Sequence, residues 1–307
     1  MKRQKFLVVM FLLLTTTLLT SCIDAYGDDP YMVKKFDASS VSSLDVNTSG
    51  GSITAIGESG RNEIVVEMYV NSWKTKDKGK IQEELEKFDI KITKEGNQII
   101  ASAKSKSTFG NNQISISFKV YVPTSISADL NTSGGSITMT GLSGNQKLNT
   151  SGGSITMKNL NGDIVATTSG GSIHINDVRG ELKGTTSGGS INAGKLNGTF
   201  NLSTSGGSIK LEDIRGEVNA HTSGGGIRAN VLELTGDITL KTSGGSIHAT
   251  LPANTGMDVY FSGNSVNTTL SNFSGKSEDD KVNGTINGGG SKVTLVTSGG
   301  SVNVNYQ

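Results

Sequence analysis

The chain has 307 residues, of which 41 are glycine and only 3 are proline, and its formal net charge is +1. This composition excludes a collagen-like protein, which needs proline and a strict three-residue glycine period, and the small charge excludes a surface built to attract nucleic acid. A single cysteine excludes an internal disulfide and a cysteine-based metal cluster.

The N-terminus predicts a lipoprotein signal peptide over residues 1–21. Basic residues precede the uncharged stretch 6–20, which is shorter than the roughly 20 residues of a spanning helix but suits the apolar part of a signal peptide. The segment Leu19-Thr20-Ser21-Cys22 resembles the lipobox of bacterial lipoproteins, which implies acylation of Cys22. An ordinary secretory signal with a coincidental cysteine is the alternative. Two or three acyl chains would hold the protein firmly to a membrane.

Residues 22–34 predict an acidic tether between the lipid and the folded part. Asp24, Asp28 and Asp29 follow the cysteine closely and resemble the surface-export signals of some Gram-negative lipoproteins. A plain solvated linker is the alternative. We therefore expect a lipid-anchored protein of the bacterial cell envelope, at the outer membrane or the cell surface.

Residues 35–130 predict a first solenoid turn, over 44–56, followed by a small α+β cap. Residues 57–110 carry 19 charged side chains in 54 positions. Their patterns indicate a strand at 64–70, a short helix at 79–88 and a hairpin around residues 95–97, with a further strand at 114–122. Such an insertion can cover strand edges that would otherwise pair with other chains.

Residues 131–250 contain a regular repeat that predicts a parallel β-solenoid with 18-residue, two-strand coils. Like residues that recur at a fixed period are typical of stacked coils. Of the 41 glycines, 24 fall in this segment, almost all at the corners between strands. An antiparallel meander of nine-residue halves is the alternative fold. The repeated tetrapeptide Thr-Ser-Gly-Gly begins at Thr48, Thr132, Thr150, Thr168, Thr186, Thr204, Thr222, Thr242 and Thr297.

Alternation within each coil predicts which side chains face inward. One inward row is expected at Ile137, Ile155, Ile173, Ile191, Ile209, Ile227 and Ile247. A corner row is expected at Leu142, Leu160, Val178, Leu196, Ile214 and Leu234. The repeat threonines have inward parity and are expected to stack as a ladder of hydroxyls. One solvent-facing row is Thr138, Thr156, His174, Asn192, Lys210, Arg228 and His248.

Residues 251–307 predict a C-terminal β cap, because the period loosens after Thr250. Strands are expected at 257–261 and 264–270. Two glycine- and serine-rich segments, at 288–295 and 298–304, then close the chain.

Several of these segments together resemble a known family. They are Lys35-Phe36-Asp37 with Leu44-Asp45-Val46, the strand running into Val122-Pro123, the Ser-Gly-Gly-Ser-Ile coils, and the ending Gly289-Gly290-Ser291-Lys292-Val293-Thr294. The chain is similar over residues 35–305 to the bacterial putative adhesin domain family and to the head GIN domain of auto-transporter adhesins. The resemblance implies a β-helical extracytoplasmic domain without catalytic residues.

The histidines and carboxylates of the repeat do not predict a metal site. His174 and His248 share the outward row but lie four coils apart, about 19 Å, and His221 lies on the other strand. A calcium β-roll needs a carboxylate in every coil, whereas Thr199 occupies one of the aligned positions. We expect neither a metal nor a cofactor.

One polar motif occurs twice, 36 residues or two coils apart, and is the candidate ligand contact. The two copies would be separated by about 9.6 Å. They could bind a sugar, or act in acid/base chemistry as in β-helical polysaccharide lyases. An exposed corner salt bridge of little energetic value is the alternative. The candidate residues are Asp177, Arg179 and Glu181 in the first copy and Asp213, Arg215 and Glu217 in the second.

The sequence therefore predicts a lipid-anchored, non-enzymatic β-solenoid that acts as an adhesin-like or structural binding protein of the cell envelope. Its expected partners are the membrane, through the lipid, and a surface glycan or protein ligand, with no nucleic acid. A polysaccharide-acting enzyme and an envelope-stress sensor remain as alternatives.

Overall fold

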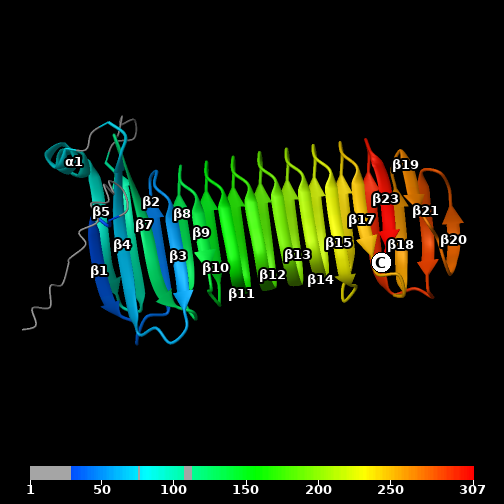
Figure 1. Cartoon of the computed structure of the whole chain (residues 1–307), viewed down its shortest axis with the longest axis horizontal. Helices are drawn as coiled ribbons and strands as arrows, with labels where there is room; N and C mark the ends of the chain where they lie inside the picture. Colours follow the sequence, from blue (N-terminus) through cyan, green and yellow to red (C-terminus); the bar gives the residue numbers. More distant parts are fainter. Residues whose placement is uncertain (1–28, 75–76, 107–112) are drawn as a thin grey trace, which may run out of the picture.

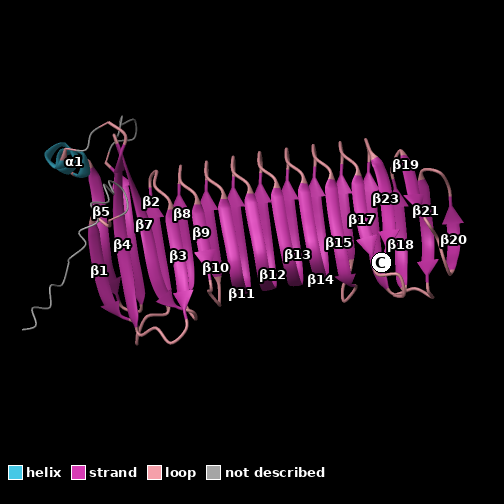
Figure 2. Ribbon diagram, viewed as in Figure 1, coloured by secondary structure: helices cyan, strands magenta, loops and turns pink. Residues whose placement is uncertain are grey.

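The computed structural model describes residues 29–74, 77–106 and 113–307, which fold into one elongated rod of stacked coils (Figure 1). Strand accounts for nearly all of its regular structure, and a short helix lies beside one end (Figure 2). None of the helical structure in these ranges is long and apolar enough to cross a membrane.

The middle of the rod is a parallel array with an 18-residue register. Ile155 lies beside Ile137 of the preceding coil and Ile173 of the following one. The predicted β-solenoid is thereby confirmed, and the antiparallel meander is wrong. The strands of this array are β8 (Ser127–Thr132), β9 (Ile137–Thr140), β10 (Gln146–Thr150), β11 (Ile155–Thr168), β12 (Ile173–Thr186), β13 (Ile191–Thr204), β14 (Ile209–Thr222), β15 (Ile227–Glu233), β16 (Ile238–Thr242) and β17 (Ile247–Leu251).

In β11–β14 the two short strands predicted for each coil form one continuous strand that bends in the middle. The bend in β11 combines Asn159, whose φ is 53°, with Gly162, whose φ is 125°. Left-handed backbone is tolerated best by asparagine, aspartate and glycine. The bend therefore explains why these residue types recur at the corner.

The inward rows form a continuous apolar core, with one correction to the corner row. The predicted inward isoleucines are all at most 1% exposed. Ile214, however, lies opposite Val231 and not opposite Leu234, which is half-buried. Glu233 lies opposite Arg215, 18 positions earlier, and Ile238 lies opposite Val218, 20 positions earlier. The two extra residues of the 20-residue coil therefore lie in the segment between β15 and β16.

The repeat threonines are buried as predicted, but their hydroxyls do not bond to one another. Thr186 Oγ1 donates to the carbonyl of Gly171 in the preceding coil at 2.7 Å and accepts from the N–H of Gly189 at 3.3 Å. Neighbouring repeat threonines make the same pair of bonds. The hydroxyl thus satisfies backbone groups on either side of the turn, which a buried polar group requires.

The second glycine of each repeat lets adjacent turns approach closely. A Cβ built on Gly189 would lie 2.0 Å from the carbonyl oxygen of Gly171, whereas one on Gly188 would lie 3.4 Å from its nearest neighbour, the carbonyl oxygen of Gly170. Only the second glycine is therefore required by the spacing between coils.

At the N-terminal end, the first coil in the sequence is not the first coil of the rod. Its strands β2 (Ser43–Thr48) and β3 (Ile53–Glu58) pair with β8 and β9 on one side and with β6 (Gln98–Ser105) and β7 (Ile114–Pro123) on the other. The predicted α+β insertion thus lies outside the first coil. Its outer elements are β1 (Met32–Asp37), β4 (Glu63–Ser72), α1 (Lys78–Leu85) and β5 (Phe88–Glu95).

The C-terminal end repeats this arrangement. Strands β22 (Ser291–Thr297) and β23 (Ser301–Tyr306) form a regular coil that pairs with β16 and β17, so this part of the predicted cap belongs to the array. Figure 1 shows these red strands between yellow and orange ones. The covering strands beyond them are β18 (Met257–Ser262), β19 (Ser265–Thr268), β20 (Phe273–Ser277) and β21 (Lys281–Ile286).

Candidate functional site

The two predicted Asp-Arg-Glu motifs lie on the exposed corner of the coils and form two different ion pairs. Arg179 Nη2 lies 3.6 Å from Asp177 Oδ1 within one coil. Arg215 Nε lies 2.9 Å from Glu233 Oε1 of the next coil and has no such pair with Asp213 or Glu217. The structure therefore does not bring the six residues into two equivalent sites.

The aspartates of these motifs have a conformational role. Asp177 and Asp213 both have φ 56° and occupy the corner position held by Asn159 and Lys195 in neighbouring coils. Aspartate and asparagine are the non-glycine residues that adopt this backbone most readily. Their recurrence is explained by the bend of the coil without any ligand.

The three histidines lie where the sequence places them, exposed and apart. His174 aligns with Asn192, and His248 aligns with Arg228, while His221 lies on the second strand beside Lys241. Within the described ranges, the structure gathers no three His, Cys, Asp or Glu side chains around a point where a metal ion could bind.

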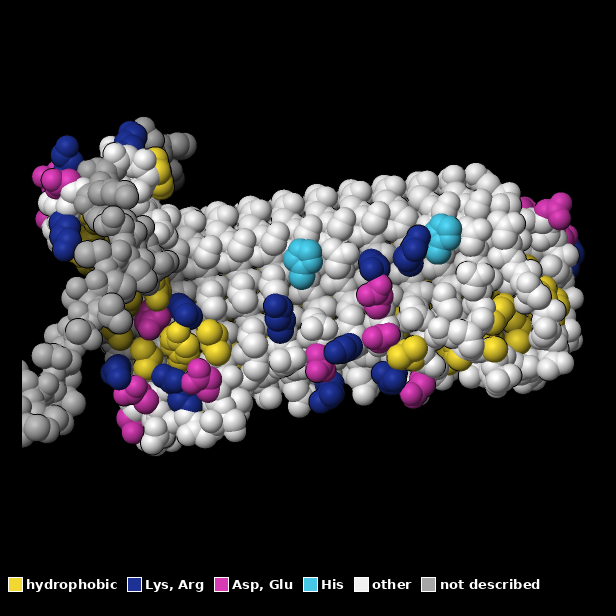
Figure 3. Space-filling model, viewed as in Figure 1, with side chains coloured by type: hydrophobic (Ala, Val, Ile, Leu, Met, Phe, Trp, Pro, Cys, Tyr) yellow, Lys and Arg dark blue, Asp and Glu magenta, His cyan; other side chains and the backbone are white. Residues whose placement is uncertain are grey.

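The most continuous candidate site is the outward surface of the first strand of each coil. We call the outward side of β9, the first halves of β11–β14, β15 and β17 the first-strand face. Two adjoining shallow hollows, of about 390 and 500 Å³, lie on it and share Asn192 and Lys210. Together they extend from Thr156 to His248. Figure 3 shows histidine and Lys or Arg side chains in a band across the middle of the array.

One glycine deepens this surface. Gly194 points outward between Asn176 and Glu212, and a Cβ on it would meet only Asn176 Oδ1, at 3.9 Å. Its φ does not lie in the left-handed region. Neither backbone conformation nor crowding requires glycine here, so the missing side chain leaves open space on the face.

Sequence reasoning identified this row as solvent-facing but did not select it as a site. The available signal was an outward glycine directly before the corner residue Lys195, next to a row that contains Lys210 and Arg228. What the sequence did not supply was which carboxylates lie close enough to neutralise those cations.

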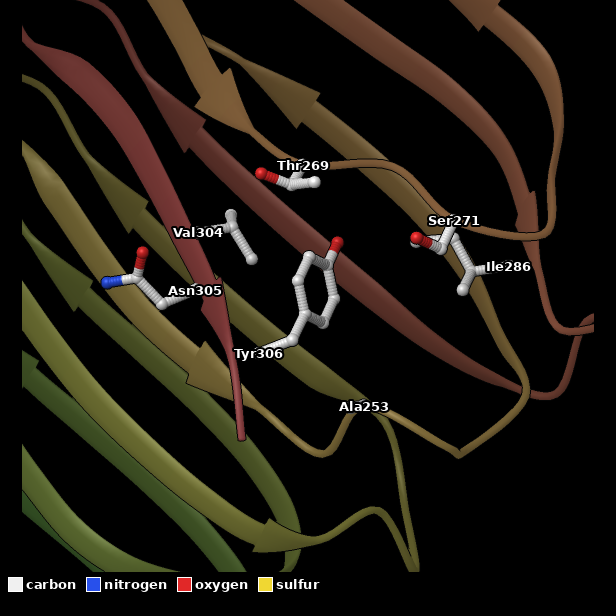
Figure 4. A pocket seen from close by; sticks show the side chains of 7 residues that line it. All are labelled: Ala253, Thr269, Ser271, Ile286, Val304, Asn305 and Tyr306. Atoms are coloured by element: carbon white, nitrogen blue, oxygen red, sulfur yellow. The ribbon is translucent and has the colours of Figure 1, made fainter.

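A separate hollow of about 340 Å³ lies where the array meets the C-terminal cap. Figure 4 shows the Tyr306 ring beside the segment that carries Thr269 and Ser271. Thr268 Oγ1 donates to the Tyr306 hydroxyl at 3.3 Å, and burial raises the pKa of Tyr306. Its lining side chains include no Asp, Glu, Lys, Arg or His, which makes it a weaker candidate for recognising a charged ligand.

Comparison with known proteins places the whole solenoid in one family. The family model described as Toastrack DUF4097 matches residues 41–305, which confirms the resemblance noted in the sequence. No curated protein matches the chain.

Two solved structures are similar over most of the chain. A "putative cell adhesion protein" from Clostridium sporogenes is 11% identical, with a TM-score of 0.21, and covers 90% of this chain and 98% of its own. A "putative adhesin" from Bacteroides fragilis is 12% identical, with a TM-score of 0.40, and covers 90% of this chain and 96% of its own. These values are too low to transfer a function.

Proposed function

The chain belongs to the Toastrack DUF4097 family, and from that premise we propose that it is a lipid-anchored, non-enzymatic binding protein of the bacterial cell envelope. The proposal has two parts that are tested separately. One is the anchor at Cys22, and the other is an adhesin-like or structural role for the surface of the solenoid.

The anchor is supported by the lipobox-like sequence that ends at Cys22, which lies outside the described residues. Ten positions separate Cys22 from Met32, where β1 begins. An extended segment of that length spans at most about 35 Å. Because β1 lies at one end of the rod (Figure 1), an anchor at Cys22 would hold the protein by that end and leave the array free to project.

The binding role is supported by one observation above all, the two adjoining hollows along the first-strand face, whose linings combine apolar side chains with Asn, Lys, Arg and His. Binding sites for extended ligands need a surface held in fixed geometry, and a parallel array of paired strands supplies one. The core beneath it is one continuous cluster of buried apolar side chains. The outward side chains can therefore vary without disturbing the fold.

A catalytic role would rest on the two Asp-Arg-Glu motifs. Arg179 and Arg215 are engaged by different carboxylates, and their side chains are 66% and 44% exposed. Acid/base catalysis by carboxylates relies on burial or close charged neighbours that tune the carboxyl group. The motifs are better explained as corner residues with exposed ion pairs, which contribute little stability.

The anchor is tested by replacing Cys22 with serine in the expressed full-length chain. We expect the variant to lose lipid labelling and to leave the membrane fraction or remain unprocessed. Unchanged labelling and membrane retention would show that Cys22 is not the attachment point.

The binding role is tested on cells and on purified protein. We expect wild-type cells to bind a glycan array or host surface better than cells lacking the gene. Depolymerisation of an acidic polysaccharide, abolished by Arg179→Ala with Arg215→Ala, would instead establish the enzyme. A transcriptional response to deletion without any binding defect would establish the sensor.

A further inference from the structure

The first-strand face carries two cationic side chains and a histidine in consecutive coils. Lys210 lies directly beside Arg228, and Arg228 lies directly beside His248. Adjacent strands are about 4.8 Å apart. Asn192 precedes Lys210 in the same row and His174 precedes Asn192, so the row spans five coils, or about 19 Å.

These cations are poorly matched by acids on the protein itself. Lys210 Nζ lies 2.6 Å from Glu212 Oε1 on its own strand, whereas Arg228 and Lys158 form no ion pair with any residue that the structure describes. Like charges directly opposite each other across strands are destabilising. The stack therefore carries a small cost in stability that an external anion would relieve.

The second strand of each coil is different, because its outward rows mix both signs. Lys147 Nζ lies 3.5 Å from Asp129 Oδ2, and Lys183 follows Glu181 by two positions on the outward side of its strand. The excess of positive charge is thus a property of the first-strand face and not of the whole chain, whose formal net charge is only +1.

The shape of the face suits a chain-like ligand rather than a compact one. The two hollows join at Asn192 and Lys210 and run across the coils. We call the two joined hollows the trough. The amides of Asn176 and Asn192 line it and can both donate and accept hydrogen bonds. The open space at Gly194 lies between them and Glu212.

We propose that the first-strand face binds a linear anionic polysaccharide laid along the rod. The proposal rests on the binding function proposed above and names its ligand class. Lys158, Lys210 and Arg228 contact the acidic groups, while the asparagine amides contact sugar hydroxyls. The spacing between successive coils is comparable to the length of one sugar residue in an extended polysaccharide. Single-stranded nucleic acid fits less well, because such sites stack bases on large aromatic side chains and no Phe, Tyr or Trp lines either hollow.

The experiment measures binding of the purified full-length protein, kept in non-ionic detergent, to polygalacturonate and heparin. Neutral dextran and a single-stranded oligonucleotide are the comparison ligands. We expect both anionic glycans to bind, with affinity that falls as salt rises, and dextran to bind weakly. A triple variant combines Lys158→Ala, Lys210→Ala and Arg228→Ala. We expect it to weaken binding of the anionic glycans about tenfold or more.

A matched triple variant removes the same charge elsewhere. It combines Arg179→Ala at the corner with Lys183→Ala and Lys241→Ala on the second strand. We expect this variant to change the affinity for the anionic glycans by less than about twofold. Gly194→Phe fills the trough without changing charge and suits an extended strand. We expect it to reduce binding severalfold while melting remains unchanged.

The proposal is overturned if both triple variants weaken binding equally, if Gly194→Phe has no effect, or if dextran or the oligonucleotide binds as tightly as the anionic glycans. Binding to cells or neutral glycans without binding to either anionic probe would reject this ligand class and leave the proposed function standing. Absence of any binding on the array, on cells and to these probes would reject both.

Discussion

Asp45 of β2 and Asp129 of β8 lie directly opposite each other in adjacent parallel strands. Asp129 is paired with Lys147 on its other side, whereas Asp45 accepts a hydrogen bond from the side chain of Asn47. Partial burial, and then the charge of Asp129, raise the pKa of the Asp45 carboxyl above its usual value of 3.8. Two like charges therefore meet where the first coil joins the array.

Asp45→Asn should stabilise the protein at neutral pH by about 0.5 kcal/mol, because like charges opposite each other in a sheet are unfavourable. A raised pKa means that the folded state takes up the proton more readily than the unfolded chain. The free energy of unfolding of the wild type should therefore approach that of the variant as pH falls through the raised pKa.

Chemical denaturation of both proteins at pH 7 and near pH 3.5 measures this difference. Asp129→Asn is the matched comparison and should gain less, since it also loses the pairing with Lys147. An Asp45→Asn variant that is no more stable than the wild type at pH 7 would show that the repulsion is screened by solvent.

The two glycines of one repeat should respond very differently to alanine. Gly189→Ala places a Cβ 2.0 Å from a backbone oxygen of the preceding coil, whereas Gly188→Ala makes an ordinary contact of 3.4 Å. We expect Gly189→Ala to lower the free energy of unfolding by about 3 kcal/mol and Gly188→Ala to have little effect.

Thermal melting followed by circular dichroism distinguishes the two variants. Both replace a glycine in the same turn, so both change the entropy of the unfolded chain similarly. Equal melting temperatures for the two would contradict the close approach of the turns.

The sequence predicted the array residue by residue because the period and the alternation agree. Ile155 and Ile173 are 18 positions apart and lie side by side, as stacking of identical coils requires. Prediction failed where the period changes. Val231, Leu232 and Leu234 are all apolar, and this coil lacks the left-handed corner residue of its neighbours, with a shift of register at Val231. Pattern alone therefore does not show which of the three faces inward.

The order of coils at the two ends was also beyond the sequence. Thr48 lies beside Thr132, 84 positions later, because the insertion leaves the first coil and the chain returns on its inner side. Composition shows that an insertion is present but not on which side of the coil it packs. The partner of Arg215 was missed for a different reason. Glu233 follows Arg215 by 18 positions and lies directly opposite it, but it lies outside the repeated Asp-Arg-Glu motif.

Lys195 is the corner residue least suited to its backbone, with φ 56°. A left-handed conformation costs an ordinary side chain about 1 kcal/mol, and asparagine tolerates it better. Lys195→Asn should therefore raise the free energy of unfolding by about 0.5 kcal/mol. Lys183→Asn removes an exposed lysine from extended backbone and should be close to neutral. Urea denaturation measures the free energy of unfolding of both variants. An equal gain in both would show that the loss of a positive charge, and not the backbone conformation at residue 195, is the cause.

Thr186 provides the most direct test of the hydrogen bonds that join successive turns. Its hydroxyl bonds to Gly171 of the preceding coil and to Gly189 of its own turn, and its side chain is 2% exposed. Thr186→Val keeps the shape but leaves both backbone groups without this partner. Because unsatisfied buried groups cost about 1–3 kcal/mol, we expect destabilisation in that range.

Thr186→Ser and Thr185→Val are the controls for this substitution. Serine keeps the hydroxyl and should lose only the contribution of one buried methyl group, whereas Thr185 faces outward and its replacement should be nearly neutral. The midpoint and slope of guanidinium denaturation, compared among the three variants, measure the effect. If Thr186→Val were as stable as Thr186→Ser, the threonine hydroxyls would not hold the turns together, and backbone pairing alone would account for the stacking of the coils.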